Sequence, residues 1–127
     1  MIVLGIDPGT AATGYGVVSG EPFGSLSLIE CGVIRTTVVL GHARGVILLA
    51  AALAGIEIHE YAPAEIKKAV VGRGGATKEQ VQFMVTRLLR LKSAPRPNDA
   101  ADGAAAALAH IMGARLPSLT PHRGRTS

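Results

Sequence analysis

The spacing of hydrophobic and polar positions divides the first third of the chain into three short extended segments. Ile2–Ile6 is an almost continuous apolar run that ends at Asp7, and a Pro-Gly pair follows. A short apolar run that ends in turn residues is typical of a buried strand. Two more strands are predicted at residues 14–19 and 25–36. Because the turns between the segments are short, the three strands should form an antiparallel meander.

The rest of the chain is mostly helical in pattern. Residues 40–54 are rich in Ala and Leu and apolar nearly all round, which predicts a helix that is buried or that meets another subunit. Residues 56–61 form a predicted fourth strand. Three further helices are predicted, over residues 62–71, from Thr77 onward, and from Asn98 to about Arg115. This order predicts an α/β fold in which helices flank a mixed sheet.

Length and composition indicate one packed domain. The chain has 127 residues, of which 48% are hydrophobic, enough for a single core. We expect a domain over residues 1–115 and a flexible tail over 116–127.

The longest apolar run, residues 45–56, is too short to cross a bilayer, and the N-terminus has no signal-peptide pattern. Cys31 is the single cysteine, so no internal disulfide can form, and we expect a reducing, cytoplasmic location.

Charge is distributed unevenly between the two halves. Residues 1–63 carry two basic and five acidic residues, whereas residues 64–127 carry eleven basic and four acidic residues. A basic half suggests a polyanionic partner, although basic residues also keep ordinary proteins in solution. Aromatic residues make up 3% of the chain, so few rings are available to stack on bases. Contacts with phosphates and with shape are therefore the expected route to nucleic acid.

The aspartates are concentrated at two places. Asp7 follows the first strand, while Asp99 and Asp102 lie three residues apart at the start of the last helix, so both point to one side. Together they could hold a divalent metal ion such as Mg²⁺, which prefers oxygen ligands. Each has a simpler interpretation: Asp7 caps its own turn, and acids in a first helical turn are stabilised by the helix dipole.

Several short motifs occur in the order of a known family. They are Ile6-Asp7-Pro8-Gly9-Thr10, Thr13-Gly14-Tyr15-Gly16-Val17-Val18, Cys31-Gly32-Val33-Ile34-Arg35-Thr36, Gly45-Val46, Val70-Val71-Gly72, Lys78 with Gln80-Val81-Gln82, and Asn98-Asp99-Ala100-Ala101-Asp102-Gly103. With these motifs the chain resembles, from its N-terminus to about residue 115, the RuvC-type Holliday-junction resolvases of the ribonuclease H-like superfamily.

The resemblance implies a homodimer that hydrolyses phosphodiesters at four-way DNA junctions in recombination and repair, with Mg²⁺ or Mn²⁺ as cofactor. It implies that Asp7, Asp99 and Asp102 are catalytic metal ligands, and that Lys67 and Lys78 contact the DNA backbone near the cut. A lysine ammonium suits a phosphate as a point charge, although both lysines could simply lie on solvated helix faces. A junction-migrating helicase complex is a further implied partner, and residues 40–54 are the expected dimer helix.

One part of the family pattern is missing. The family places a helix, and then a strand that ends in a catalytic Glu, between the Ile-Arg-Thr strand and the apolar helix. Here about 40 residues are absent between residues 37 and 38, roughly what a helix and a strand require. Either the sequence omits a segment of the protein, which we favour, or the chain is short. In a short chain, residues 56–61 could lie beside the Asp7 strand and bring Glu60 towards the metal.

An intact mass separates these two explanations. Omission predicts a mass above the 13.0 kDa of this sequence, by roughly the mass of the missing helix and strand. A measured mass equal to 13.0 kDa would exclude omission.

Two other functions remain possible from the sequence. A truncated relative could recognise branched DNA without cutting it, which the missing Glu would favour. A kinase-like phosphate-binding protein built on residues 7–10 ranks last, because the chain is too short for two lobes that would enclose a nucleotide.

Overall fold

A sheet of three strands and a layer of helices make up the described part of the protein. The computed structural model describes residues 1–9, 12–35 and 40–113. In chain order the elements are β1 (Ile2–Asp7), β2 (Ala12–Gly20), β3 (Leu26–Arg35), α1 (Leu40–Leu53), α2 (Pro63–Val71), α3 (Lys78–Leu88) and α4 (Asn98–Gly113). The predicted α/β fold class, the antiparallel meander and the four helices are confirmed.

The strands pair antiparallel in the order β1-β2-β3. Asp7 lies opposite Gly14, and Gly5 lies opposite Gly16. Because side chains alternate between the two faces of a strand, Asp7 shares a face with Gly5 and with its partner Gly14. A bulge at Val17 and Val18 shifts the register between β2 and β3.

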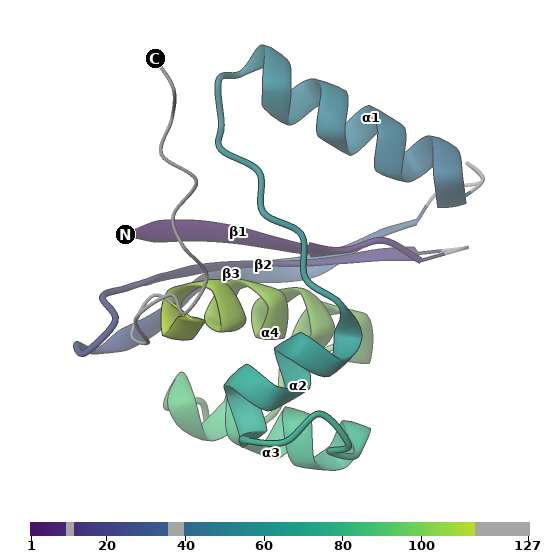
Figure 1. Ribbon diagram of the computed structural model, residues 1–127. Coiled ribbons are helices and arrows are strands. Elements are labelled where there is room, and N and C mark those ends of the chain that lie inside the picture. The colour runs from purple at the N-terminus through teal and green to yellow at the C-terminus, as the bar shows by residue number, and fades with distance from the viewer. Residues whose placement is uncertain (10–11, 36–39, 114–127) are drawn as a thin grey trace.

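Helix α4 packs directly on this glycine-lined face of the sheet (Figure 1). A Cβ atom on Gly5 would lie 2.0 Å from the carbonyl oxygen of Gly103, and one on Gly16 would lie 2.6 Å from the Cα of Ala104. Neither position can hold a side chain, so the backbones of sheet and helix touch. The glycines therefore determine how close α4 lies to β1 and β2.

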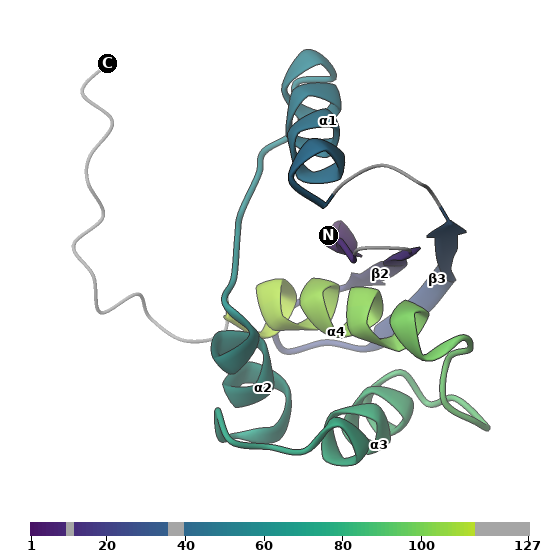
Figure 2. The same ribbon diagram turned by 90° about the vertical axis from the view of Figure 1, so that its right-hand side faces the viewer.

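The hydrophobic core continues below α4, on the side away from the sheet. Helices α2 and α3 cover this side of α4 in both views (Figure 2). Val70, Val85 and Leu89 meet Leu108 and Ile111 of α4 in one buried cluster. The core is aliphatic, as the scarcity of aromatic residues predicts.

Local capping explains where two helices begin. Pro63 is the first residue of α2, where its missing N–H is not needed. The Thr77 hydroxyl accepts a hydrogen bond of 3.2 Å from the backbone N–H of Gln80, and the Thr77 backbone N–H donates one of 2.8 Å to Oε1 of the Gln80 side chain. Both starts agree with the sequence prediction.

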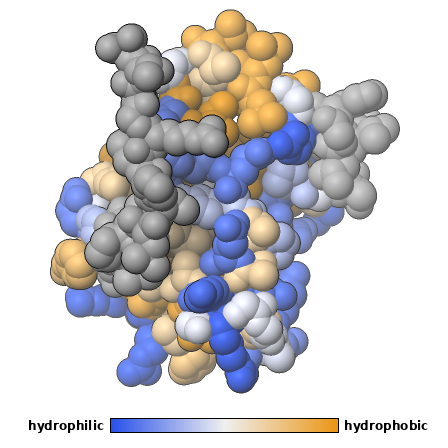
Figure 3. Space-filling model, viewed as in Figure 1, coloured by the Kyte–Doolittle hydropathy of each residue, from blue (hydrophilic) through white to orange (hydrophobic). Residues whose placement is uncertain are grey.

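Helix α1 lies on the other side of the sheet from α4 (Figure 2). Its predicted extent is confirmed, but Val46, Leu49 and Leu53 are exposed rather than buried. On the face that the space-filling view shows, the largest group of hydrophobic residues lies over this helix (Figure 3). None of the described helices is both long and apolar enough to span a membrane.

The predicted strand at residues 56–61 is wrong. These residues form an irregular connection between α1 and α2, and β1 pairs only with β2 among the described residues. Contacts with α4 hold the connection instead: the Tyr61 hydroxyl lies 2.6 Å from Nδ1 of His110, and the His59 and His110 rings are 4.6 Å apart. Alternating apolar and polar residues predict an extended chain, but a β-strand forms only where a second strand lies alongside it.

The hypothesis that Glu60 approaches the metal also fails. Glu60 forms an ion pair with Arg44 of α1, and its segment does not lie beside β1. The predicted break between residues 37 and 38 and the predicted tail at 116–127 fall outside the described residues.

Candidate metal centre

Asp7 ends β1 on the face that carries α4. Pro8 follows directly and has no backbone N–H to continue the ladder, so the strand stops and the carboxylate stands at its end. The side chain is partly open to solvent, while the neighbouring protein atoms withdraw some of it from water.

The first turn of α4 brings the other two aspartates to the same place. A Cβ atom on Gly14, the residue opposite Asp7, would lie 1.7 Å from the backbone carbonyl oxygen of Asp99. The backbone of Asp99 therefore lies against β2 beside the end of β1. Asp102 follows one helical turn later, and both side chains are half-buried.

Electrostatics shows that the three carboxyl groups interact. The pKa of Asp7 lies above its ordinary value of 3.8, first because of partial burial, and then because of repulsion by Asp102 and Asp99. The positive charge of Lys78 lowers the pKa of Asp7 and so offsets part of this rise. The structure thus gathers three acids with incomplete compensation by positive charge, an arrangement that a cation would stabilise.

The two predicted DNA-contacting lysines differ in position. Lys78, the first residue of α3, has its Nζ atom 3.4 Å from Oδ2 of Asp102 and lowers the pKa of Asp7. Lys67 lies half-buried on α2. Of these two lysines, only Lys78 affects the pKa of Asp7, so only Lys78 is brought to the aspartates.

The arrangement of the aspartates is compatible with a hard divalent ion that keeps water among its ligands. Within the described ranges, no three His, Cys, Asp or Glu side chains are close enough to hold one ion together. Mg²⁺ commonly keeps several waters and takes one or two carboxylates directly. A site in which some of the three aspartates bind through water is therefore compatible with the arrangement.

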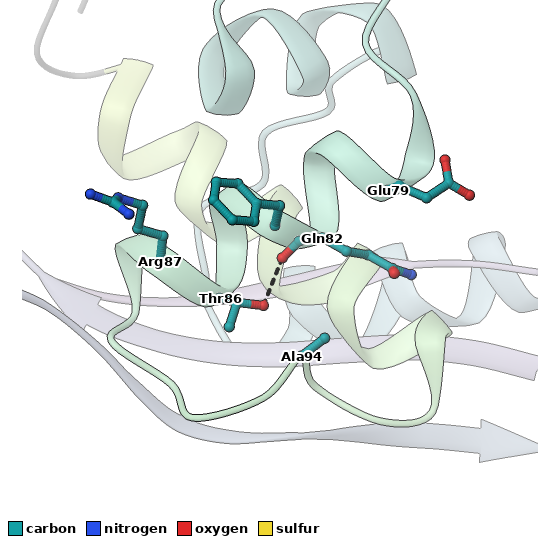
Figure 4. Close-up of a pocket in the computed structure, with 6 residues that line it drawn as sticks. Glu79, Gln82, Thr86, Arg87 and Ala94 are labelled. Atoms are coloured by element: carbon teal, nitrogen blue, oxygen red, sulfur yellow. Dashed lines mark hydrogen bonds between the residues drawn. The ribbon is translucent and has the colours of Figure 1, made fainter.

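A shallow pocket of about 330 Å³ lies elsewhere, along the outer side of α3 (Figure 4). Its lining includes Glu79, Phe83 and Arg87, and the Thr86 hydroxyl donates a 2.7 Å hydrogen bond to the carbonyl oxygen of Gln82 there. None of the three aspartates lines it. The pocket is thus separate from the candidate metal centre.

Sequence reasoning missed the glycines that build the site. Gly14, Gly16 and Gly103 were part of the family motifs, but their role as the contact surface between sheet and α4 was not predicted. The signal was present in the sequence as glycine at alternate positions of β2, which leaves one face of the strand without side chains.

The pH dependence of stability should reveal the raised pKa of Asp7, which burial and then repulsion by Asp102 and Asp99 produce. A carboxyl group whose pKa is raised on folding destabilises the folded state above that pKa, and the penalty disappears as the pH falls through it. Without metal, Asp7→Asn should therefore be more stable than wild type at about pH 8, by at most about 1 kcal/mol because solvent screens the site. The difference should shrink towards about pH 4. Urea unfolding in EDTA measures it, and identical pH profiles for the two proteins would contradict the assignment.

Comparison with known proteins gives one consistent family. The family model described as "Crossover junction endodeoxyribonuclease RuvC" matches residues 3–39 and 36–110. A protein of that name from Syntrophomonas wolfei is 38% identical, covering 93% of this chain and 92% of the relative. Another from Chlorobium phaeovibrioides is 38% identical, covering 88% and 82%.

Two solved structures are similar as well. The Thermus thermophilus RuvC structure matches with a TM-score of 0.82 and 31% identity, covering 91% of this chain and 96% of that chain. Thermus thermophilus RuvC in complex with a Holliday junction substrate matches with a TM-score of 0.84 and 31% identity, covering 91% and 95%.

The alignments also locate a difference in length. The match to the Syntrophomonas wolfei protein extends over 160 positions, more than the 127 residues of this chain, so at least 33 positions stand opposite gaps here. The two matched segments of the family model overlap at residues 36–39, around the position where the resemblance to the family implied a missing segment.

Proposed function

Because this chain belongs to the RuvC family of crossover junction endodeoxyribonucleases, we propose that it cuts four-way DNA junctions by hydrolysing phosphodiesters, in recombination and repair. The observation that carries the proposal is the similarity to Thermus thermophilus RuvC bound to a Holliday junction, over 91% of this chain. The three aspartates gathered at the end of β1 provide a place for the chemistry.

Asp7, Asp99 and Asp102 are the proposed catalytic metal ligands, with Mg²⁺, or Mn²⁺ in its place, as the cofactor. A divalent ion held there would activate water and stabilise the leaving oxygen of the phosphodiester. Asp7 contributes a carboxylate on a strand end, which limits its movement, while Asp99 and Asp102 contribute theirs from the first turn of a buried helix. The pKa of Asp7 is raised first by partial burial and then by repulsion from Asp102 and Asp99, and this repulsion supports the proposal because a cation would relieve it.

Lys78 and Lys67 are the proposed contacts to the DNA backbone. Lys78 stands next to the aspartates, so a phosphate that it binds would lie beside the metal centre. Arg73, in the loop before α3, donates a 3.2 Å hydrogen bond to the Gln80 side chain and adds positive charge near the start of the same helix. The excess of basic residues in the second half of the chain supports a branched DNA partner.

A homodimer, a helicase partner and a cytoplasmic location complete the proposal. Helix α1 is the proposed dimer contact, because its exposed Val46, Leu49 and Leu53 need a partner. A complex with a junction-migrating helicase and the cytoplasmic location rest on the family and, for the location, on the free Cys31.

The rival function, a non-cleaving module that binds branched DNA, is not favoured, since the relatives are named as endonucleases. The test is incubation of the protein with an end-labelled four-way junction in Mg²⁺ and in EDTA. We expect nicks only with the metal and only on the junction, with linear duplex of the same sequence as control. A mobility shift without nicks in either Mg²⁺ or Mn²⁺ would overturn cleavage in favour of the binding module.

Lys78→Met should separate the two roles of this lysine. Removing its charge should raise the pKa of Asp7 further and strengthen Mg²⁺ binding, because the ion no longer competes with an ammonium group. The Lys78 side chain is largely exposed, so we expect a change of about fivefold or less. Junction affinity should fall at the same time.

Lys67→Met is the matched control for that experiment. It should weaken junction binding and leave the metal affinity unchanged, because Lys67 does not affect the pKa of Asp7. Isothermal titration with Mg²⁺ and gel shifts in EDTA measure the two effects. Equal metal affinities in Lys78→Met and wild type would contradict the role assigned to Lys78.

A further inference from the structure

The outer face of α3 carries a phenylalanine that is open to solvent. Phe83 is 63% exposed and lines the pocket of about 330 Å³ on this helix. The opposite side of α3 is buried through Val81 and Val85, so the helix packs on the rest of the protein without Phe83. A single exposed apolar side chain is ordinary on a protein surface. The residues around Phe83 therefore decide whether this face has a partner.

Two opposite charges lie on either side of Phe83. Glu79 comes four residues before it and Arg87 four residues after it, and both line the same pocket. Residues four apart are neighbours on one helix face, so the three side chains form a single row. Glu79 and Arg87 are about 12 Å apart along the helix axis, too far to pair with each other, and they point away from each other (Figure 4). Neither forms an ion pair with another residue in the described ranges.

This row is complementary to itself. A two-fold interface requires a surface that matches a second copy of itself in the reversed direction. When two α3 helices lie antiparallel with the axis at Phe83, each Glu79 faces the Arg87 of the other copy and the two phenylalanine rings meet at the centre. A parallel arrangement would place like charges opposite each other. The spacing of the three residues thus indicates a second copy of this chain as the partner.

The place of α3 in the fold leaves room for this contact. Helices α1 and α3 lie on opposite sides of the sheet and α4 in both views (Figures 1 and 2), so a contact through α3 does not occupy the proposed dimer helix. None of the three aspartates lines the pocket, so the candidate metal centre stays separate as well. Helix α3 has 11 residues and is about 16 Å long, so two such helices make a small interface. Small interfaces give weak association.

We propose that the α3 face formed by Glu79, Phe83 and Arg87 is a self-association surface, through which two copies of this chain pack antiparallel about a two-fold axis. The aromatic pair at the centre provides most of the affinity. The two Glu-Arg pairs set the antiparallel direction and the register, because opposite charges across an interface give specificity more than affinity. The contact is additional to the α1 dimer, and it requires neither a metal ion nor junction cleavage.

The first test is sedimentation equilibrium of the 127-residue chain without DNA or metal, at about 0.15 M salt, where repulsion between basic chains is screened. Concentrations from about 10 µM to about 1 mM cover weak association. We expect the average mass to rise with concentration towards twice that of the species present at the lowest concentration. Phe83→Ala should weaken this association by at least about fivefold. Phe23→Ala is the matched control, because Phe23 is 85% exposed in the turn between β2 and β3 and should have no effect.

Charge exchange tests the direction and the register. Glu79→Arg alone and Arg87→Glu alone each place like charges opposite each other and should abolish association, whereas an equal mixture of the two variants should associate. The double variant Glu79→Arg/Arg87→Glu has the same net charge as wild type. It should associate with itself but not with wild type that is fluorescently labelled at its N-terminus.

Circular dichroism confirms that each variant is folded, because a base in the first turn of α3 opposes the helix dipole. The proposal is overturned if the average mass stays constant up to about 1 mM, or if Phe83→Ala associates like wild type. It is also overturned if the double variant binds wild type as well as it binds itself, because the charges would then have no part in the contact.

Discussion

Asp7→Asn is expected to reduce junction cleavage by about 10³-fold or more while junction binding stays within about threefold of wild type. An asparagine keeps the size of the side chain but removes the negative charge that attracts the metal ion. The pKa of Asp7 is raised first by partial burial and then by repulsion from Asp102 and Asp99, so this carboxylate interacts electrostatically with the other two. Single-turnover cleavage at saturating protein measures the loss without a contribution from binding.

Glu79→Gln is the matched control for that loss. It also removes one acidic charge close to Lys78 in sequence, but Glu79 lines the separate pocket on α3. Its cleavage rate should stay within about threefold of wild type. If Asp7→Asn cut at the rate of Glu79→Gln, Asp7 would have no catalytic role, whatever holds the metal.

Gly14→Val is expected to destabilise the protein by about 3 kcal/mol or more, a large part of the total stability of a domain of this size. A Cβ atom at this position would lie 1.7 Å from the backbone carbonyl oxygen of Asp99, so α4 must move away from the sheet. The carbonyl group of Asp99 is part of the helix backbone, so it cannot rotate away from the new side chain as another side chain could. Urea unfolding followed by circular dichroism measures the loss.

Gly75→Ala is the corresponding control, because nothing lies within 4 Å of a Cβ atom there. Its stability should stay within about 0.5 kcal/mol of wild type. If Gly14→Val folded with wild-type stability, the close packing of α4 on β2 would be wrong. The position of Asp99 beside Asp7 would then lose its structural basis.

Much of the fold could be predicted because its signals are local. The apolar run before Asp7, the turn residues between strands, the Pro63 start and the Thr77 cap each act within a few residues, and all of these elements are confirmed. The segment 56–61 failed for the opposite reason. A strand exists only where a partner strand lies, and contacts of His59 and Tyr61 with His110 hold this segment against α4 instead.

The sequence alone was sufficient for the family, for the three strands and four helices, and for the placement of Asp99 and Asp102 on one side of a helix, because these depend on neighbours in the chain. Only the tertiary structure decided that Asp7 lies close enough to Asp99 and Asp102 to be repelled by them and that Lys78 rather than Lys67 stands beside the aspartates. Asp7 and Asp99 are far apart in sequence. Their approach depends on glycines that let the backbone of α4 touch β2, a close packing that no local pattern contains.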